Sequence, residues 1–196
     1  MPNWCYTTYY IEGDREEIFK FGEMLYELEK LSDSRIPNDF GNLFLGCLID
    51  YLGGDWESTP CRGYIMEWER THSGDIIIEV ESAWQEPSET RKFLKEKFPG
   101  LNFWFRSEEK GNEYFVKNDV TGKYFNEKFI VECYDPETRV DESEYFEDIA
   151  EIPIYLKEKL GLECPADFDV IKLVFDQWRD ENDDRLGFIA KFDIVD

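Results

Sequence analysis

The order of its periodic patterns most constrains how this chain can fold. Residues 5–11 are rich in Tyr and Thr, which favours a strand. Asp14 and Glu17 resemble a capping box, after which apolar residues recur at helical spacing to about residue 31. Within residues 64–81, two stretches of alternating apolar and polar side chains flank a turn, which predicts a β-hairpin.

The next stretch adds another helix and strand. Ser88 can cap a helix that ends at Pro99-Gly100, alternation from Leu101 predicts a strand, and residues 114–117 predict a returning strand. The order strand, helix, strand, strand, helix, strand is the split βαβ arrangement of a ferredoxin-like sandwich. We therefore expect an α+β protein whose residues 1–120 form a ferredoxin-like domain, with one helical layer on an antiparallel sheet.

Residues 121–196 differ in character and are strongly acidic. Residues 132–151 hold nine acids and a single base, Arg139. Because no Pro- or Ser-rich linker precedes them, we expect residues 121–196 to form an acidic α/β extension packed on the first domain. The patterns predict a strand at residues 129–133, helices around residues 145–149 and 168–178, and a last strand at residues 188–194.

The chain combines a large excess of acid with a large apolar content. It has 45 acids against 22 bases and a net charge of −23, yet 42% of its residues are hydrophobic and 17% are aromatic. Disordered acidic segments lack large apolar residues, so here the acid coats a folded body. This charge favours a basic protein surface as the partner. It argues against direct binding of duplex nucleic acid, which needs clustered Lys and Arg.

The sequence predicts no membrane span and no secretion signal. Its longest apolar run, residues 43–49, is interrupted by Gly46 and is far shorter than the roughly 20 residues of a span. The N-terminus has neither a basic nor an apolar signal region. The five scattered cysteines lack a CxxC pair and are expected to be core residues. We expect a soluble, cytoplasmic protein without a membrane partner or a cofactor.

Few residue patterns favour catalysis or metal binding. The one histidine, His72, lies in the predicted hairpin turn, so no Ser-His-Asp or Cys-His triad is supported. Residues 180–184 open like an EF-hand loop, but Arg185 and Lys191 stand where that loop requires Gly and Glu. We therefore expect no catalytic, cofactor or metal site.

A set of carboxylates leaves one enzymatic alternative open. Glu67, Glu69, Glu79 and Glu81 share one outward face of the predicted hairpin. That face is either the polar side of a sheet or part of a divalent-metal site. The alternative function is therefore a carboxylate- and metal-dependent enzyme acting on a nucleotide or a nucleic acid.

Three tryptophans, Trp4, Trp56 and Trp84, lie near predicted strand or loop ends. An aromatic side chain in such a place either covers the core or anchors a partner. Stacking of single-stranded nucleic acid on this fold class requires basic residues beside the aromatics, whereas the outward face here carries glutamates.

Four stretches carry a family resemblance: Met1-Pro2-Asn3-Trp4-Cys5, Gly53-Gly54-Asp55-Trp56, Ser82-Ala83-Trp84-Gln85-Glu86-Pro87 and Lys97-Phe98-Pro99-Gly100-Leu101. Together they resemble the YubB-like family of phage- and plasmid-borne proteins with a ferredoxin-like domain, over roughly residues 1–120. The resemblance implies the fold and a mobile-element origin, and it implies no activity. This chain departs from the family pattern at Thr7, where Asn is usual, and at Leu52 and Asp55, which replace a Trp and a Lys.

These observations predict a non-enzymatic acidic binding protein of a mobile genetic element. Its acidic face would engage a basic host protein surface, as a nucleic-acid mimic or inhibitor. Two other interpretations remain open, namely that the acid only confers solubility and that the chain is a structural phage component. The predicted protein-binding residues are Trp4, Trp56, Trp84, Asp141, Glu142, Glu144, Glu147, Asp148, Asp180, Glu181, Asp183 and Asp184.

Overall fold

A computed structural model describes residues 3–196, so Met1 and Pro2 of the first motif lie outside the described residues. The chain forms an α+β protein, as expected, and divides into two compact units. The first unit runs to Asp119 and also includes Val195 and Asp196, and the second spans residues 120–194. None of the helices within residues 3–196 is both long enough and apolar enough to cross a bilayer.

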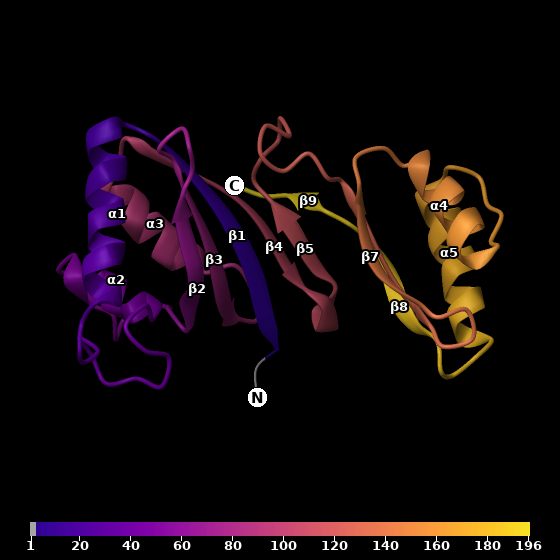
Figure 1. The fold of residues 1–196 in the computed structure, drawn as a ribbon, viewed down its shortest axis with the longest axis horizontal. Coiled ribbons are helices and arrows are strands. Elements are labelled where there is room, and N and C mark those ends of the chain that lie inside the picture. Colours follow the sequence, from indigo (N-terminus) through magenta and orange to yellow (C-terminus); the bar gives the residue numbers. More distant parts are fainter. Residues whose placement is uncertain (1–2) are drawn as a thin grey trace. The chain divides into compact units, whose positions relative to one another are not determined.

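The first unit has three helices packed on one face of an antiparallel sheet (Figure 1). The strand order within this unit is β2-β3-β1-β4-β5. The short strand β9 is Asp193–Ile194. Each strand and helix predicted for residues 5–117 is present. The elements are β1 (Trp4–Gly13), α1 (Arg15–Glu29), α2 (Leu45–Tyr51), β2 (Gly63–Arg70), β3 (Ile76–Ala83), α3 (Ser88–Lys97), β4 (Leu101–Glu109), the 3-10 turn η1 (Lys110–Asn112) and β5 (Tyr114–Lys117).

Alternation along β1 gives the sheet one buried and one open face. Tyr9 and Ile11 are buried in the same core as Phe21 and Leu25 of α1, whereas Tyr6 is half exposed on the opposite face. Because side chains of a strand alternate between the two faces of its sheet, the even-numbered residues of β1 belong to the face without helices.

The start of α1 differs from the predicted capping box. Asp14 caps the helix through Oδ1, which accepts from the N–H groups of Glu16 and Glu17 at 3.0 Å each. The carboxylate of Glu17, however, accepts from the Gly100 N–H at 2.8 Å, and the Asp14 N–H donates to the Gly100 carbonyl at 3.1 Å. The reciprocal bond of a capping box is therefore replaced by a tie between the start of α1 and the loop before β4.

The predicted cap of α3 is wrong. Pro87 occupies the N-cap position without a side-chain cap bond, and Ser88 is the first helical residue. Proline is well suited to a helix start because it lacks the N–H that would remain unsatisfied there.

The second unit is a three-stranded antiparallel sheet covered on one face by two helices (Figure 1). Its strand order is β7-β6-β8, and its core joins Val131 and Ile189 of the sheet to Leu156 and Phe175 of the helices. The elements are β6 (Phe129–Asp135), β7 (Val140–Phe146), α4 (Glu151–Leu160), α5 (Phe168–Asp180) and β8 (Leu186–Lys191).

Two predictions for this unit need correction. Tyr145 and Phe146 belong to β7, which pairs with β6 along its length, and not to a helix. The helix of this region begins later, at Glu151, and buries Ile152 and Leu156. The predicted last strand is also interrupted at Phe192, which separates β8 from β9.

Candidate protein-binding site

Three of the four motif stretches meet at one end of the first sheet. Trp4 pairs in register with Ala83, and the N–H of Trp84 donates to the Asn3 carbonyl at 2.9 Å. The fourth stretch lies at the other end of β1, where Leu101 pairs with Gly13.

An aromatic row links Trp4 to the stretch that contains Trp56. The ring of Trp4 lies edge-on to Phe40 at a centroid distance of 5.9 Å. Phe40 stacks on Phe44 at 5.5 Å, and Phe44 meets the edge of Trp56 at 6.5 Å. Trp4 and Trp56 are therefore both partly buried, and Trp56 packs against the core of the first unit.

Trp84 is different because its side chain is 50% exposed and its φ is +74°. A left-handed conformation costs a non-glycine residue roughly 1–2 kcal/mol. The segment is held in place by the Ser82 hydroxyl, which donates to the Gln85 carbonyl at 2.8 Å. Strained backbone clusters at functional sites, and tryptophan is enriched among the residues that dominate binding energy. Of the three predicted tryptophans, Trp84 is thus the one available to a partner.

A buried polar network supports the Trp84 segment from below. Glu86 has a side chain only 3% exposed, and its carboxylate pairs with Nε of Arg91 at 2.8 Å. The hydroxyl of Tyr9 donates to the same carboxylate, and Nη2 of Arg91 donates to the Asp196 carbonyl at 3.0 Å. Burial, and then the nearby Glu86 carboxylate, hold the pKa of Tyr9 well above its usual value. The network ties β1, α3 and the Trp84 segment together.

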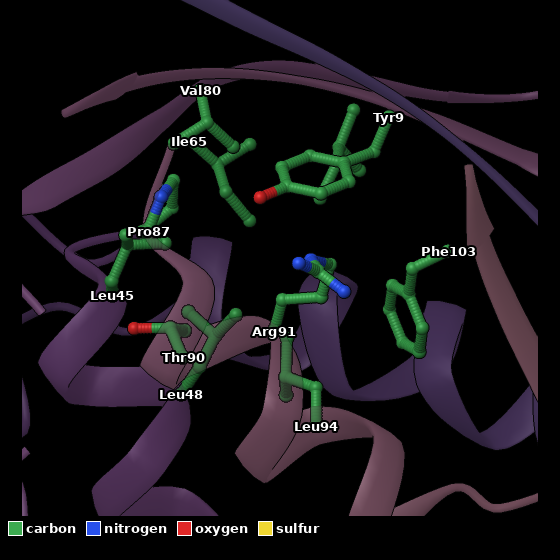
Figure 2. A pocket seen from close by; sticks show the side chains of 11 residues that line it. Tyr9, Leu45, Leu48, Ile65, Val80, Pro87, Thr90, Arg91, Leu94 and Phe103 are labelled. Atoms are coloured by element: carbon green, nitrogen blue, oxygen red, sulfur yellow. The ribbon is translucent and has the colours of Figure 1, made fainter. Parts of the chain in front are cut away.

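The gap beside this network is too small for a substrate. Its volume is about 20 Å³, and mostly apolar side chains of the sheet, α2 and α3 surround it (Figure 2). Tyr9 and Arg91 direct their polar ends into it, as Figure 2 shows. Such a volume holds about one water molecule, whereas ligand pockets span about 300–1,000 Å³. A surface groove of about 390 Å³, which Arg62, Trp84 and Glu89 help to line, is the larger space near the motifs.

The open face of β1, β2 and β3 combines acids with exposed aromatics. We call Tyr6, Tyr64, Glu67, Glu79 and Glu81 the acidic–aromatic face. In the strand register Glu81 lies between Tyr6 and Tyr64, and Glu67 lies opposite Glu79. Both tyrosines hydrogen-bond the Glu81 carboxylate, which raises the pKa of Tyr6 and raises that of Tyr64 to about 12.

Sequence reasoning missed the two tyrosines of this face. The alternation along the hairpin predicts Glu67, Glu79 and Glu81 on one outward side and Tyr64 on the opposite side. A bulge between Ile65 and Glu67 instead brings Tyr64 to the face of the glutamates. The position of Tyr6 beside Glu81 depends on the register between β1 and β3, which strand periodicity does not specify.

The acids predicted in the second unit are not brought together. Asp141, Glu142 and Glu144 lie on the edge strand β7, and Glu147 and Asp148 follow its last residue. Asp180 is the last residue of α5, and Glu181, Asp183 and Asp184 lie in the turn between α5 and β8. The register of β6 places that turn near the first residues of β7, at the end opposite Glu147.

Several of these acids already have structural partners. Glu142 pairs with Lys159 at 2.7 Å and accepts from the Tyr155 hydroxyl at 3.3 Å, and Lys159 is the main cause of its lowered pKa. Asp180 pairs with Arg179 at 3.0 Å, and the Asp148 carboxylate accepts from the Ala150 N–H at 2.9 Å. The second unit therefore presents dispersed negative charge and not one acidic site.

Metal or nucleophilic chemistry would have to use the histidine, the carboxylates or the cysteines. His72 is exposed in the β2–β3 turn. Within residues 3–196, no three His, Cys, Asp or Glu side chains are grouped so that they could hold a metal ion. The five cysteines are unpaired, and burial raises the pKa of Cys5 to about 11. A thiol with a raised pKa is a poor nucleophile at neutral pH.

Comparisons of this chain with protein-family models, with curated proteins and with solved structures find no match.

Proposed function

We propose that this protein is a non-enzymatic acidic binding protein that engages a basic surface on another protein. The acidic–aromatic face carries the proposal. The strands β1, β2 and β3 contain one base, Arg70, whose guanidinium contacts the Phe19 carbonyl and Glu23 of α1. Glu67, Glu79 and Glu81 form no ion pair within residues 3–196, so their charges are available to a cationic partner.

The two kinds of side chain have separate roles in this proposal. The net charge of −23 attracts a basic protein over a distance of about a Debye length and speeds association. Exposed aromatic residues such as Tyr6 and Trp84 supply short-range affinity. The dispersed acids of the second unit add to the attraction without forming a contact site of their own.

We also propose that the first unit is a ferredoxin-like domain and that the chain shares the mobile-element origin of the YubB-like family. The sheet order β2-β3-β1-β4, with helices on one face, supports the first part. The convergence of three motif stretches around Trp4 and Trp84 supports the second. A host-directed binding protein is consistent with such an origin.

A salt-dependent binding measurement tests the proposed function. The intact chain is titrated by calorimetry with a short oligolysine, at about 50 mM and at about 500 mM salt, where the Debye length falls well below 10 Å. We expect saturable binding at low salt and at least tenfold weaker binding at high salt, about 1.4 kcal/mol. An oligoglutamate of equal length is the control. Absence of saturable binding, or equal affinity at both salt concentrations, would contradict the proposal.

A further inference from the structure

We propose that Tyr6, Glu81 and Tyr64 form a receptor for one cationic side chain, a lysine or an arginine, on a basic segment of the partner protein. This inference rests on the proposed function and adds to it the residues that recognise the cation.

The strand register gives the receptor its shape. Tyr6 of β1 and Tyr64 of β2 lie directly opposite Glu81 of β3, on either side of it. Neighbouring strands are about 4.8 Å apart, so the two tyrosines start roughly 10 Å from each other. A cation bound at Glu81 therefore has a tyrosine on the neighbouring strand on each side, from which cation–π attraction can add to the ion pair.

The hydrogen bonds leave part of the Glu81 carboxylate free. An ionised carboxylate has about four lone-pair sites, and the two phenols use two of them. Because hydrogen bonding raises the pKa of both phenols, they remain protonated donors at neutral pH and add no charge of their own. The remaining lone pairs can accept from an ammonium or a guanidinium group.

The surroundings hold the receptor in place and extend it. The ring of Trp4 lies edge-on to Tyr64 at 6.3 Å. Glu79 lies two residues before Glu81 on the same face, about 6.6 Å along the strand, with Glu67 opposite it. A segment with cations at alternate positions of an extended chain can therefore meet Glu81 and the Glu67–Glu79 pair in turn.

Charge complementarity selects this occupant over a second copy of the chain. Two such faces brought together would oppose carboxylates without a compensating base, because Arg70 of β2 is directed to α1. A basic segment instead removes the like-charge repulsion between Glu67 and Glu79, which lie directly opposite each other.

The test is calorimetric titration of the full chain with an extended peptide that carries arginine at alternate positions. Glu81→Gln removes the charge but keeps the shape, and Tyr6→Ala removes one ring. We expect each to weaken binding about tenfold, whereas Tyr6→Phe, which keeps the ring, weakens it about threefold or less. Tyr26→Ala, at a tyrosine 43% exposed on α1, and Glu96→Gln, at an exposed acid of α3, are the matched controls and should bind as the parent does.

The outcomes separate the two proposals. Salt-sensitive binding of the peptide that Glu81→Gln and Tyr6→Ala leave unchanged overturns the receptor and leaves the proposed function standing. Absence of binding to the parent protein at low salt overturns both. Analytical ultracentrifugation of the parent protein and the same variants tests whether a second copy of the chain occupies the face. If the parent self-associates and Tyr6→Ala abolishes this self-association, the face belongs to a second copy and the receptor is overturned. Near-ultraviolet circular dichroism establishes that each variant is folded.

Discussion

Removing the charge of Glu86 should destabilise the first unit by about 3 kcal/mol. Loss of one partner from a buried ion pair costs about 3–5 kcal/mol, because the other charge remains without compensation. In Glu86→Gln the uncompensated group is Arg91, which is 15% exposed and retains the Asp196 carbonyl at 3.0 Å and the Phe105 ring at 4.8 Å. These contacts place the effect at the lower end of the range.

The converse substitution should be more damaging. Arg91→Met leaves the Glu86 carboxylate, whose side chain is 3% exposed, with the Tyr9 hydroxyl as its remaining side-chain partner. We expect a loss of about 4–5 kcal/mol, since a deeper charge has a larger desolvation penalty. The double variant Glu86→Gln/Arg91→Met removes both charges. Its loss of unfolding free energy should therefore be at least about 2 kcal/mol smaller than the sum of the losses in the two single variants.

Urea unfolding at pH 7, followed by tryptophan fluorescence, measures these differences. Five of the six tryptophans belong to the first unit, so the signal reports mainly on that unit. Lys92→Met is the control, because Lys92 pairs with Glu89 on the surface, and its loss should change stability by less than about 0.5 kcal/mol. If either single variant loses less than about 1 kcal/mol of unfolding free energy, or if the loss in the double variant equals the sum of the two, Glu86 and Arg91 are not a buried, coupled pair.

Three further predictions concern the backbone and the response to pH. Trp84→Gly should be more stable to urea than Trp84→Ala by about 1 kcal/mol, because φ is +74°, and equal stabilities would contradict strain there. Gly13→Ala should lower the melting temperature far more than Gly53→Ala. A Cβ at Gly13 would lie 2.1 Å from the Gly100 carbonyl oxygen. At Gly53, where φ is +73°, a Cβ meets open space and adds only the cost of a positive φ, so similar losses would contradict this packing. The folded-state pKa of Cys5 is raised from 9.0 to about 11. The contribution of the neutral thiol to the stability of the fold is therefore fully present below pH 9 and is lost as the pH rises towards 11. Cys5→Ala should therefore show a shallower loss of stability over that interval, and an unchanged slope would contradict the prediction.

The helices and strands of the first unit were predictable because their signals are local. Strand β3 of its hairpin alternates between buried and open positions along its whole length, whereas β2 does so only at its start, because a bulge between Ile65 and Glu67 shifts its register. The edge strand β7 defeats the same reasoning because acids lie on both of its faces, so its alternation is lost. Ile152 and Leu156 of α4 carry a helical spacing, but Pro153 lies between them and obscures the start of the helix.

The candidate site was predictable only in part. Trp84 was selected by its position at the end of a predicted strand, and the structure leaves it exposed. Glu86 belongs to the same stretch, yet an isolated acid in a sequence predicts a surface residue, and its burial depends on Arg91 and Tyr9. Of the acids predicted as a site in the second unit, the β6–β7 and β6–β8 registers place Glu147 and Asp148 at the end of the sheet opposite to Asp141 and the turn before β8.

The sequence by itself determined the α+β class, the order of the first elements and the acidic character of the surface. Those properties follow from local periodicity and composition, which each segment carries on its own. Only the tertiary structure decided that Tyr6 and Tyr64 flank Glu81, and that Glu86 is buried against Arg91. Both arrangements depend on strand register and on the packing of α3, which join residues far apart in the chain and are fixed only when the whole core forms.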